Sequence, residues 1–141
     1  MRLWHYAMIE FLPRQQLLSQ WRECVCIAKS IHEKGTPNHI LVNKIMDYPI
    51  SEFNDYCNIV LVEMIKRGYK VSESSINKLK KYTGFNVDSD KQYAKPFKGW
   101  HEFMYLRQYF YNLEEKFHCG GISYREWDKL YQGYKEIVGL C

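Results

Sequence analysis

The sequence contains no long hydrophobic segment, and this absence already excludes a class of protein. No stretch approaches the roughly 20 apolar residues that a helix needs to cross a bilayer. The chain also does not open with the basic stretch and apolar run of a secretion signal. We therefore expect a soluble, cytoplasmic protein without a membrane partner.

An even set of cysteines is also missing, since there are five: Cys24, Cys26, Cys57, Cys119 and Cys141. An odd number in a chain without a secretion signal argues against a disulfide framework and predicts free, mostly buried thiols. The pairs Cys24-x-Cys26 and His118-Cys119 lack the usual spacing of zinc ligands. We therefore expect no metal and no Cys-His nucleophile.

Several familiar motifs are absent as well. The sequence has no phosphate-binding loop, Rossmann glycine pattern or nucleophile elbow. It has no internal repeat, no low-complexity tract and no alternating apolar pattern long enough for a strand. The fold class is therefore predicted to be all-α, and any chemistry must depend on less conspicuous residues.

What the chain does contain fits one compact domain over residues 1–141. Its apolar content of 46% is enough for a hydrophobic core. The net charge of +4 slightly favours a polyanionic partner. Aromatic residues make up 16% of the chain, and such rings either fill a core or stack on bases.

Apolar residues at helical spacing predict a long N-terminal helix and about four further helices. The first should run over residues 13–32, the second over 51–67 and the third over 73–82. Residues 83–99 carry glycine and proline among polar residues, which is typical of an irregular connection.

Two more helices are predicted near the C-terminus. A stripe from Phe103 to Phe117 indicates the fourth, and Ser123 followed by Glu126 is typical of a capping box that opens the fifth. The aromatic spacing around Trp127 fits core packing better than base contact, although both readings stay open.

Four segments together resemble a known family. The main one is Leu12-Pro13-Arg14-Gln15-Gln16-Leu17-Leu18-Ser19-Gln20-Trp21-Arg22-Glu23, and the others are residues 63–71, 113–117 and 1–5. Their spacings resemble the pyrimidine-dimer DNA glycosylases typified by phage endonuclease V, with residues 1–5 closer to a bacterial branch. The resemblance implies an all-helical DNA-repair protein.

In that family the N-terminal α-amine attacks the sugar of a damaged nucleotide, and a glutamate of the first helix assists. The resemblance therefore implies catalytic roles for Met1 and Glu23. A free α-amine has a reference pKa of about 7.7 to 8.0, so a neutral fraction exists near pH 7. Without the resemblance, Glu23 is more simply an exposed helix glutamate paired with a cation.

The chain departs from the family at its start. The family exposes a small residue after methionine removal, whereas Arg2 follows Met1 here. Aminopeptidases generally need a small second residue, so Met1 is expected to stay. Aligning Arg2 with the family arginine then makes Met1 the residue that carries the reactive amine.

The resemblance also implies a DNA-binding face. Its expected members are Arg2, Gln15, Gln16, Arg22 and Lys116. Arginine and lysine would bind phosphates, and glutamine could hydrogen-bond bases or backbone around a kinked duplex. Each of these residues taken alone also fits an ordinary solvated surface.

Three functions are therefore compared. The first is a monomeric, cofactor-free DNA glycosylase and abasic-site lyase that acts on cyclobutane pyrimidine dimers in double-stranded DNA. The second is a non-catalytic DNA-binding or damage-sensing helical module. The third is an unrelated helical interaction protein that would show no salt-sensitive DNA binding.

Overall fold

The computed structural model describes residues 1–139, and within that range it contains helices and no β-strand. Its α-helices are α1 (Arg14–Lys34), α2 (Ile50–Lys66), α3 (Glu73–Thr83), α4 (Phe103–His118) and α5 (Tyr124–Gly139). The described residues also form three short 3₁₀ helices. The first, η1 (Tyr6–Phe11), precedes α1, η2 (Asn43–Asp47) lies between α1 and α2, and η3 (Ser89–Lys91) lies between α3 and α4. The predicted all-α class, with one long N-terminal helix and four more, is confirmed.

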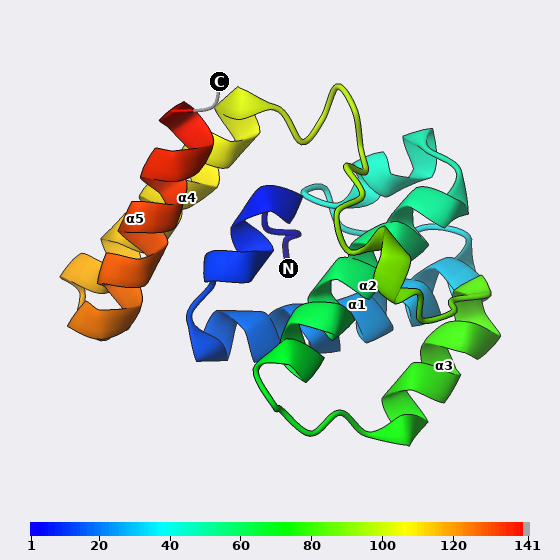
Figure 1. Cartoon of the computed structure of the whole chain (residues 1–141). Coiled ribbons are helices and arrows are strands. Elements are labelled where there is room, and N and C mark those ends of the chain that lie inside the picture. Colours follow the sequence, from blue (N-terminus) through cyan, green and yellow to red (C-terminus); the bar gives the residue numbers. More distant parts are fainter. Residues whose placement is uncertain (140–141) are drawn as a thin grey trace.

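Helix α1 packs its apolar stripe against α2 and α3. Leu17, Trp21 and Cys24 are buried on this face. The indole Nε1 of Trp21 donates a hydrogen bond to Ser75 Oγ at 3.0 Å, which ties α1 to the first turn of α3. Because the stripe is continuous, α1, α2 and α3 form one packed group (Figure 1).

The predicted capping box links the last helix to the first. Ser123 Oγ accepts the backbone N–H of Glu126 at 3.2 Å, as the pattern predicted. The Glu126 carboxylate also accepts the N–H of Arg14 at 2.8 Å. That hydrogen bond is the main reason why the pKa of Glu126 is lowered. One glutamate therefore serves the N-terminal ends of both α1 and α5.

The 3₁₀ helix η1, which periodicity did not reveal, lies between α2 and α5. Arg67 at the end of α2 donates to the carbonyl of Leu12 at 2.8 Å and pairs with Glu63 at 2.7 Å. On the other side, the Phe11 ring packs directly on Gly133 of α5. A Cβ atom at Gly133 would lie only 2.3 Å from Phe11 Cγ.

Helices α4 and α5 form an antiparallel pair beside the α1–α3 group (Figure 1). Stacked rings join the two helices. Phe110 and Tyr134 have centroids 3.8 Å apart, and Phe117 and Trp127 have centroids 4.9 Å apart. The structure therefore assigns Trp127 to packing between helices, whereas Tyr124 is 76% exposed.

Four cysteines within residues 1–139 carry free thiols. Cys24 and Cys57 are buried, but Cys26 and Cys119 are exposed, so the prediction of mostly buried thiols is wrong for half of them. Cys26 lies off the apolar stripe of α1, and Cys119 follows the last residue of α4. Cys141 lies outside the described residues. No helix in the described part of the chain is long and apolar enough to span a membrane.

Candidate active site at the N-terminus

The first residues of the chain form an irregular segment between the α1–α3 group and the α4–α5 pair (Figure 1). Gln20 of α1 binds this segment with both ends of its amide. Its Nε2 donates to the carbonyl of Arg2 at 3.0 Å, and its Oε1 accepts the N–H of Trp4 at 2.8 Å. Gln20 is 1% exposed, so the amide is buried, and its Oε1 also lies 3.0 Å from the Tyr56 hydroxyl.

Two tyrosines hold the same segment from other helices. Tyr56 of α2 donates its hydroxyl to the carbonyl of Trp4 at 2.5 Å, and Tyr105 of α4 donates to the carbonyl of Leu3. Burial raises the pKa of both tyrosines, so both remain protonated donors near neutral pH. The segment is thus fixed from three helices.

Glu23 lies one turn after Gln20 on the same face of α1 and reaches the start of the chain. Its Oε2 accepts the backbone N–H of Arg2 at 3.2 Å. The α-amine of Met1 is three bonds away from that backbone nitrogen. The half-buried Glu23 carboxylate is therefore placed beside the residue that carries the amine, and the Met1 side chain is 41% exposed.

The Arg2 side chain is held by aromatic rings. Its guanidinium carbon lies 5.3 Å from the ring centroid of Trp4 and 5.3 Å from that of Tyr109. Such cation–π contacts fix the orientation of the guanidinium while leaving its N–H edge able to donate. Arg2 therefore brings a positive charge to the same place as Met1 and Glu23.

The other residues predicted for DNA binding are distributed along two helices. Gln15 and Arg22 are exposed on α1, where Arg22 Nη2 donates to Ser19 Oγ at 3.1 Å. Gln16 is half-buried, and its Oε1 has no hydrogen-bond partner among the described residues. Lys116 is exposed in the last turn of α4.

Lys116 is not brought together with the N-terminal site. Tyr105, which contacts Leu3, lies in the first turn of α4, and Lys116 follows it eleven positions later in the same helix. At 1.5 Å per residue this separation is roughly 16 Å. A role for Lys116 would therefore be in contacts away from the reacting centre.

A buried histidine pair lies behind the N-terminal segment. His5 Nδ1 accepts the N–H of Ala7 at 3.1 Å, so its Nε2 carries the hydrogen that is donated to the carbonyl of His101 at 2.9 Å. His101 Nδ1 accepts the N–H of Tyr6 at 3.2 Å. Burial lowers the pKa of His5 to about 4 and that of His101 to about 2.

Sequence analysis missed Gln20, Tyr56 and Tyr105. Gln20 left one signal, because it is a polar residue within the apolar stripe of α1, between Leu17 and Cys24. A buried amide needs hydrogen-bond partners, and here the partners are backbone groups of Arg2 and Trp4, which are distant from Gln20 in sequence. The tyrosines left no such signal, since their rings are indistinguishable from core residues by spacing.

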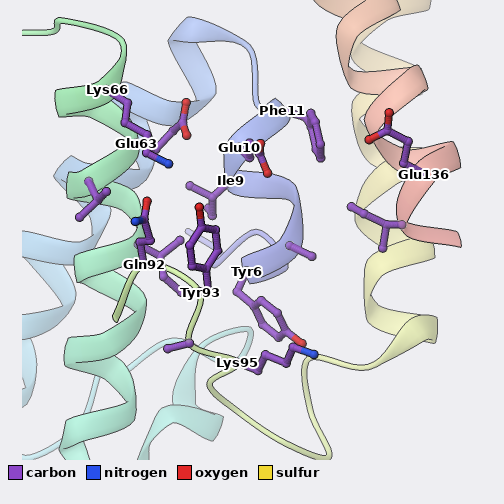
Figure 2. Close-up of a pocket in the computed structure, with 15 residues that line it drawn as sticks. Tyr6, Ile9, Glu10, Phe11, Glu63, Lys66, Gln92, Tyr93, Lys95 and Glu136 are labelled. Atoms are coloured by element: carbon purple, nitrogen blue, oxygen red, sulfur yellow. The ribbon is translucent and has the colours of Figure 1, made fainter. Parts of the chain in front are cut away.

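A separate groove of about 350 Å³ lies between η1, α2, residues 92–95 and α5 (Figure 2). Among its lining residues, the acidic side chains are Glu10, Glu63 and Glu136, and the basic ones are Lys66 and Lys95. Met1, Arg2 and Glu23 do not line it, as far as the described residues show. Three carboxylates against two lysines make this groove a poor match for DNA phosphates.

Comparison with known proteins identifies a family for this chain. The family model described as pyrimidine dimer DNA glycosylase matches residues 1–77. This range contains Met1, Arg2, Gln20, Glu23 and Tyr56. The comparison with curated proteins and the comparison with solved structures gave no match.

Proposed function

Because the chain belongs to the pyrimidine dimer DNA glycosylase family, we propose that it is a bifunctional glycosylase and abasic-site lyase in which the amine of Met1 is the nucleophile. The substrate is double-stranded DNA that contains a cyclobutane pyrimidine dimer. One observation carries the proposal: the N–H of Arg2, the residue that follows the amine-bearing Met1, contacts Glu23 Oε2 at 3.2 Å.

In the glycosylase step, the neutral amine of Met1 forms a bond to C1′ of one nucleotide of the dimer. The bond from C1′ to the pyrimidine nitrogen breaks, and the pyrimidine keeps the bonding pair and takes up a proton. The attacking nitrogen loses a proton, which the Glu23 carboxylate accepts. The same carboxylate stabilises the positive charge that develops on the sugar.

In the following steps, Glu23 returns its proton to the ring oxygen O4′ as the C1′–O4′ bond breaks. This leaves a protonated imine between C1′ and the Met1 nitrogen. Loss of a proton from C2′ then expels the 3′-phosphate, which cuts the strand. Water hydrolyses the imine and releases the amine. The chain itself supplies the nucleophile and the proton carrier, so the proposal requires no cofactor.

DNA binding would use the basic and amide side chains beside the site. Arg2 and Arg22 would contact phosphates near the reacting sugar, and Gln15 and Gln16 would face bases or backbone of the bent duplex. Lys116 would contact a phosphate farther along the duplex. A dimer weakens stacking, so nucleotide flipping costs less there than in intact DNA. We further propose a monomer that acts in the cytoplasm.

Borohydride reduction on dimer-containing DNA tests the mechanism. We expect a covalent adduct, and peptide mapping should place it on the nitrogen of a retained Met1. An adduct on a lysine would reassign the nucleophile. Strand cleavage without any adduct would exclude the imine, whereas DNA binding without cleavage or adduct would favour a damage-sensing module.

An added N-terminal residue tests the position of the amine. The extended chain still ends in an amine, but that nitrogen is displaced by up to about 3.8 Å. Since a misplacement of about 1 Å can cost roughly 10²-fold in rate, trapping should fall by at least that factor. Unchanged trapping by the extended protein would contradict a fixed attack position.

A further inference from the structure

We propose that Gln20 is a positioning residue, which sets the register of the N-terminal segment so that the amine of residue 1 lies beside Glu23. The inference rests on the proposed function. The side chains of Gln20, Tyr56 and Tyr105 together form what we call the N-terminal clamp.

The clamp solves a hydrogen-bonding problem that the fold creates. Residues 2–4 form neither a helix nor a strand, and their neighbours are helices, whose backbone groups are already used within the helix. The segment therefore cannot pair as a strand does in a sheet. Its buried carbonyls and N–H groups must be satisfied by side chains, and the clamp supplies these.

Gln20 is the member that fixes the register. An amide offers a donor and an acceptor at a fixed separation, and here they engage Arg2 O at 3.0 Å and Trp4 N at 2.8 Å. A slip of the segment by one residue would present the wrong groups to both ends of the amide. Each tyrosine makes a single bond to the segment and restricts it less.

The register matters because Glu23 binds the neighbouring polar group of the segment, the backbone N–H of Arg2. Gln20 and Glu23 are three positions apart on α1, so their side chains lie on one face of the helix. Gln20 takes the carbonyl of Arg2, and Glu23 takes its N–H at 3.2 Å. Both backbone polar groups of Arg2 are thereby fixed, so the preceding amine can move only by rotation about the Met1 Cα–C bond.

A matched pair of variants tests this role. Gln20→Met removes both hydrogen bonds to the segment, and the contact of Oε1 with the Tyr56 hydroxyl, with little change in volume. Asn58→Leu does the same to another buried amide, which binds the backbone of Asp88 through bonds of 2.6 Å and 2.9 Å. Asn58 is 2% exposed, so both variants should lose comparable thermal stability.

Single-turnover borohydride trapping separates the two variants. We expect Gln20→Met to slow trapping by about 10²-fold, while its Kd for dimer-containing DNA changes by less than about threefold. Asn58→Leu should form the trapped DNA adduct at the same rate as the unmodified protein. Equal trapping by Gln20→Met and the unmodified protein, or equal loss in both variants, would overturn the clamp alone. Absence of trapping by the unmodified protein would instead overturn the proposed function and, with it, this role.

A conservative variant adds a readout that global stability does not move. Gln20→Glu keeps an acceptor for the N–H of Trp4 and regains a donor to the carbonyl of Arg2 only when its carboxyl is protonated. Its trapping rate, divided by that of the unmodified protein at the same pH, should rise as pH falls. A ratio independent of pH would contradict the need for that donor.

Discussion

Helices α1 and α4 both contact the N-terminal segment, but they use different chemistry. Helix α1 binds its backbone through the hydrogen bonds of Gln20 and Glu23. Helix α4 mainly presents rings, with Tyr109 below the Arg2 guanidinium and Tyr105 packed on Tyr109 at 4.4 Å between centroids. Hydrogen bonds specify a register atom by atom, whereas ring contacts accept small shifts.

The match to the family follows the same division. Residues 1–77 include α1 and α2 with the polar contacts of Gln20, Glu23 and Tyr56, whereas α4, which adds the hydrogen bond of Tyr105, and α5 lie beyond the matched range. We infer that the first half of the chain fixes the reacting groups and that the α4–α5 pair covers them.

Removing the carboxylate should affect the chemistry most. Glu23→Gln keeps the size of the side chain but cannot carry the proton, and general acid–base catalysis typically contributes about 10²- to 10⁴-fold. We expect strand cleavage to fall by that factor with DNA affinity largely kept. Glu33→Gln, which changes an exposed glutamate of the same helix, is the control. Full cleavage by Glu23→Gln would remove Glu23 from the mechanism.

The difference between local signals and contacts that are distant in sequence explains what the sequence could and could not predict. The five α-helices follow from apolar periodicity, Pro13, and the cap at Ser123, because these signals are local. The helix η1 did not, since its C-terminal end is fixed by Arg67 of α2 on one side and by the fit of Phe11 on Gly133 of α5 on the other. Both partners are distant in sequence.

The candidate site was partly predictable for the same reason. Met1 and Glu23 came from a motif, and the structure places them at neighbouring positions, although their roles remain a proposal. The clamp could not be derived, because Tyr56 and Tyr105 are ordinary core residues by spacing. Only tertiary structure shows that their hydroxyls meet the backbone of Leu3 and Trp4.

Acid should destabilise the junction between the two regions, where His5 and His101 are buried. Their pKa values are lowered from 6.5 to about 4 and about 2, so the folded state resists protonation. Stability is therefore complete above the unfolded pKa of about 6.5 and declines as pH falls below it. Each histidine lowers the free energy of unfolding by at most about 1.4 kcal/mol per pH unit below pH 6.5. This decline continues to about pH 4 for His5 and to about pH 2 for His101.

Urea unfolding as a function of pH measures this effect. His101→Phe should flatten the decline between pH 6.5 and 4, because one titrating group is gone from the aromatic cluster. The exposed His118→Gln is the control and should leave the slope unchanged. A decline of equal slope in all three proteins would exclude the buried pair as its source.

The contact between η1 and α5 should tolerate little added volume. Alanine favours a helix over glycine by about 1 kcal/mol. At Gly133, however, the new Cβ would lie 2.3 Å from Phe11 Cγ, and overpacking typically costs about 1–3 kcal/mol. We expect Gly133→Ala to lower the free energy of unfolding by about 1 kcal/mol, the balance of these two terms.

Two further variants identify the cause of that loss. Gly139→Ala lies in the same helix with no atom within 4 Å of the new Cβ, so it should cause no loss. In a Phe11→Ala background the clash is removed, and Gly133→Ala should become neutral or stabilising. An equal loss in both backgrounds would exclude the packing of Phe11 on Gly133.

The smallest expected effect concerns the expected phosphate contacts, which occur in both regions. Arg2 is part of the N-terminal segment, Arg22 directly precedes Glu23 in α1, and Lys116 lies in the last turn of α4. Each phosphate contact releases counterions on binding, so losing one should lower the slope of log K against log salt by about 1.

Because Arg2 also contacts two rings, Arg22→Gln and Lys116→Gln give the cleaner comparison. Lys91→Gln, whose ammonium lies 3.7 Å from Asp55, is the control. Equal slope changes for Arg22 and Lys116 would show that DNA extends over both regions. A change for Arg22 alone would confine the DNA to α1, and no change for either would refute the proposed face.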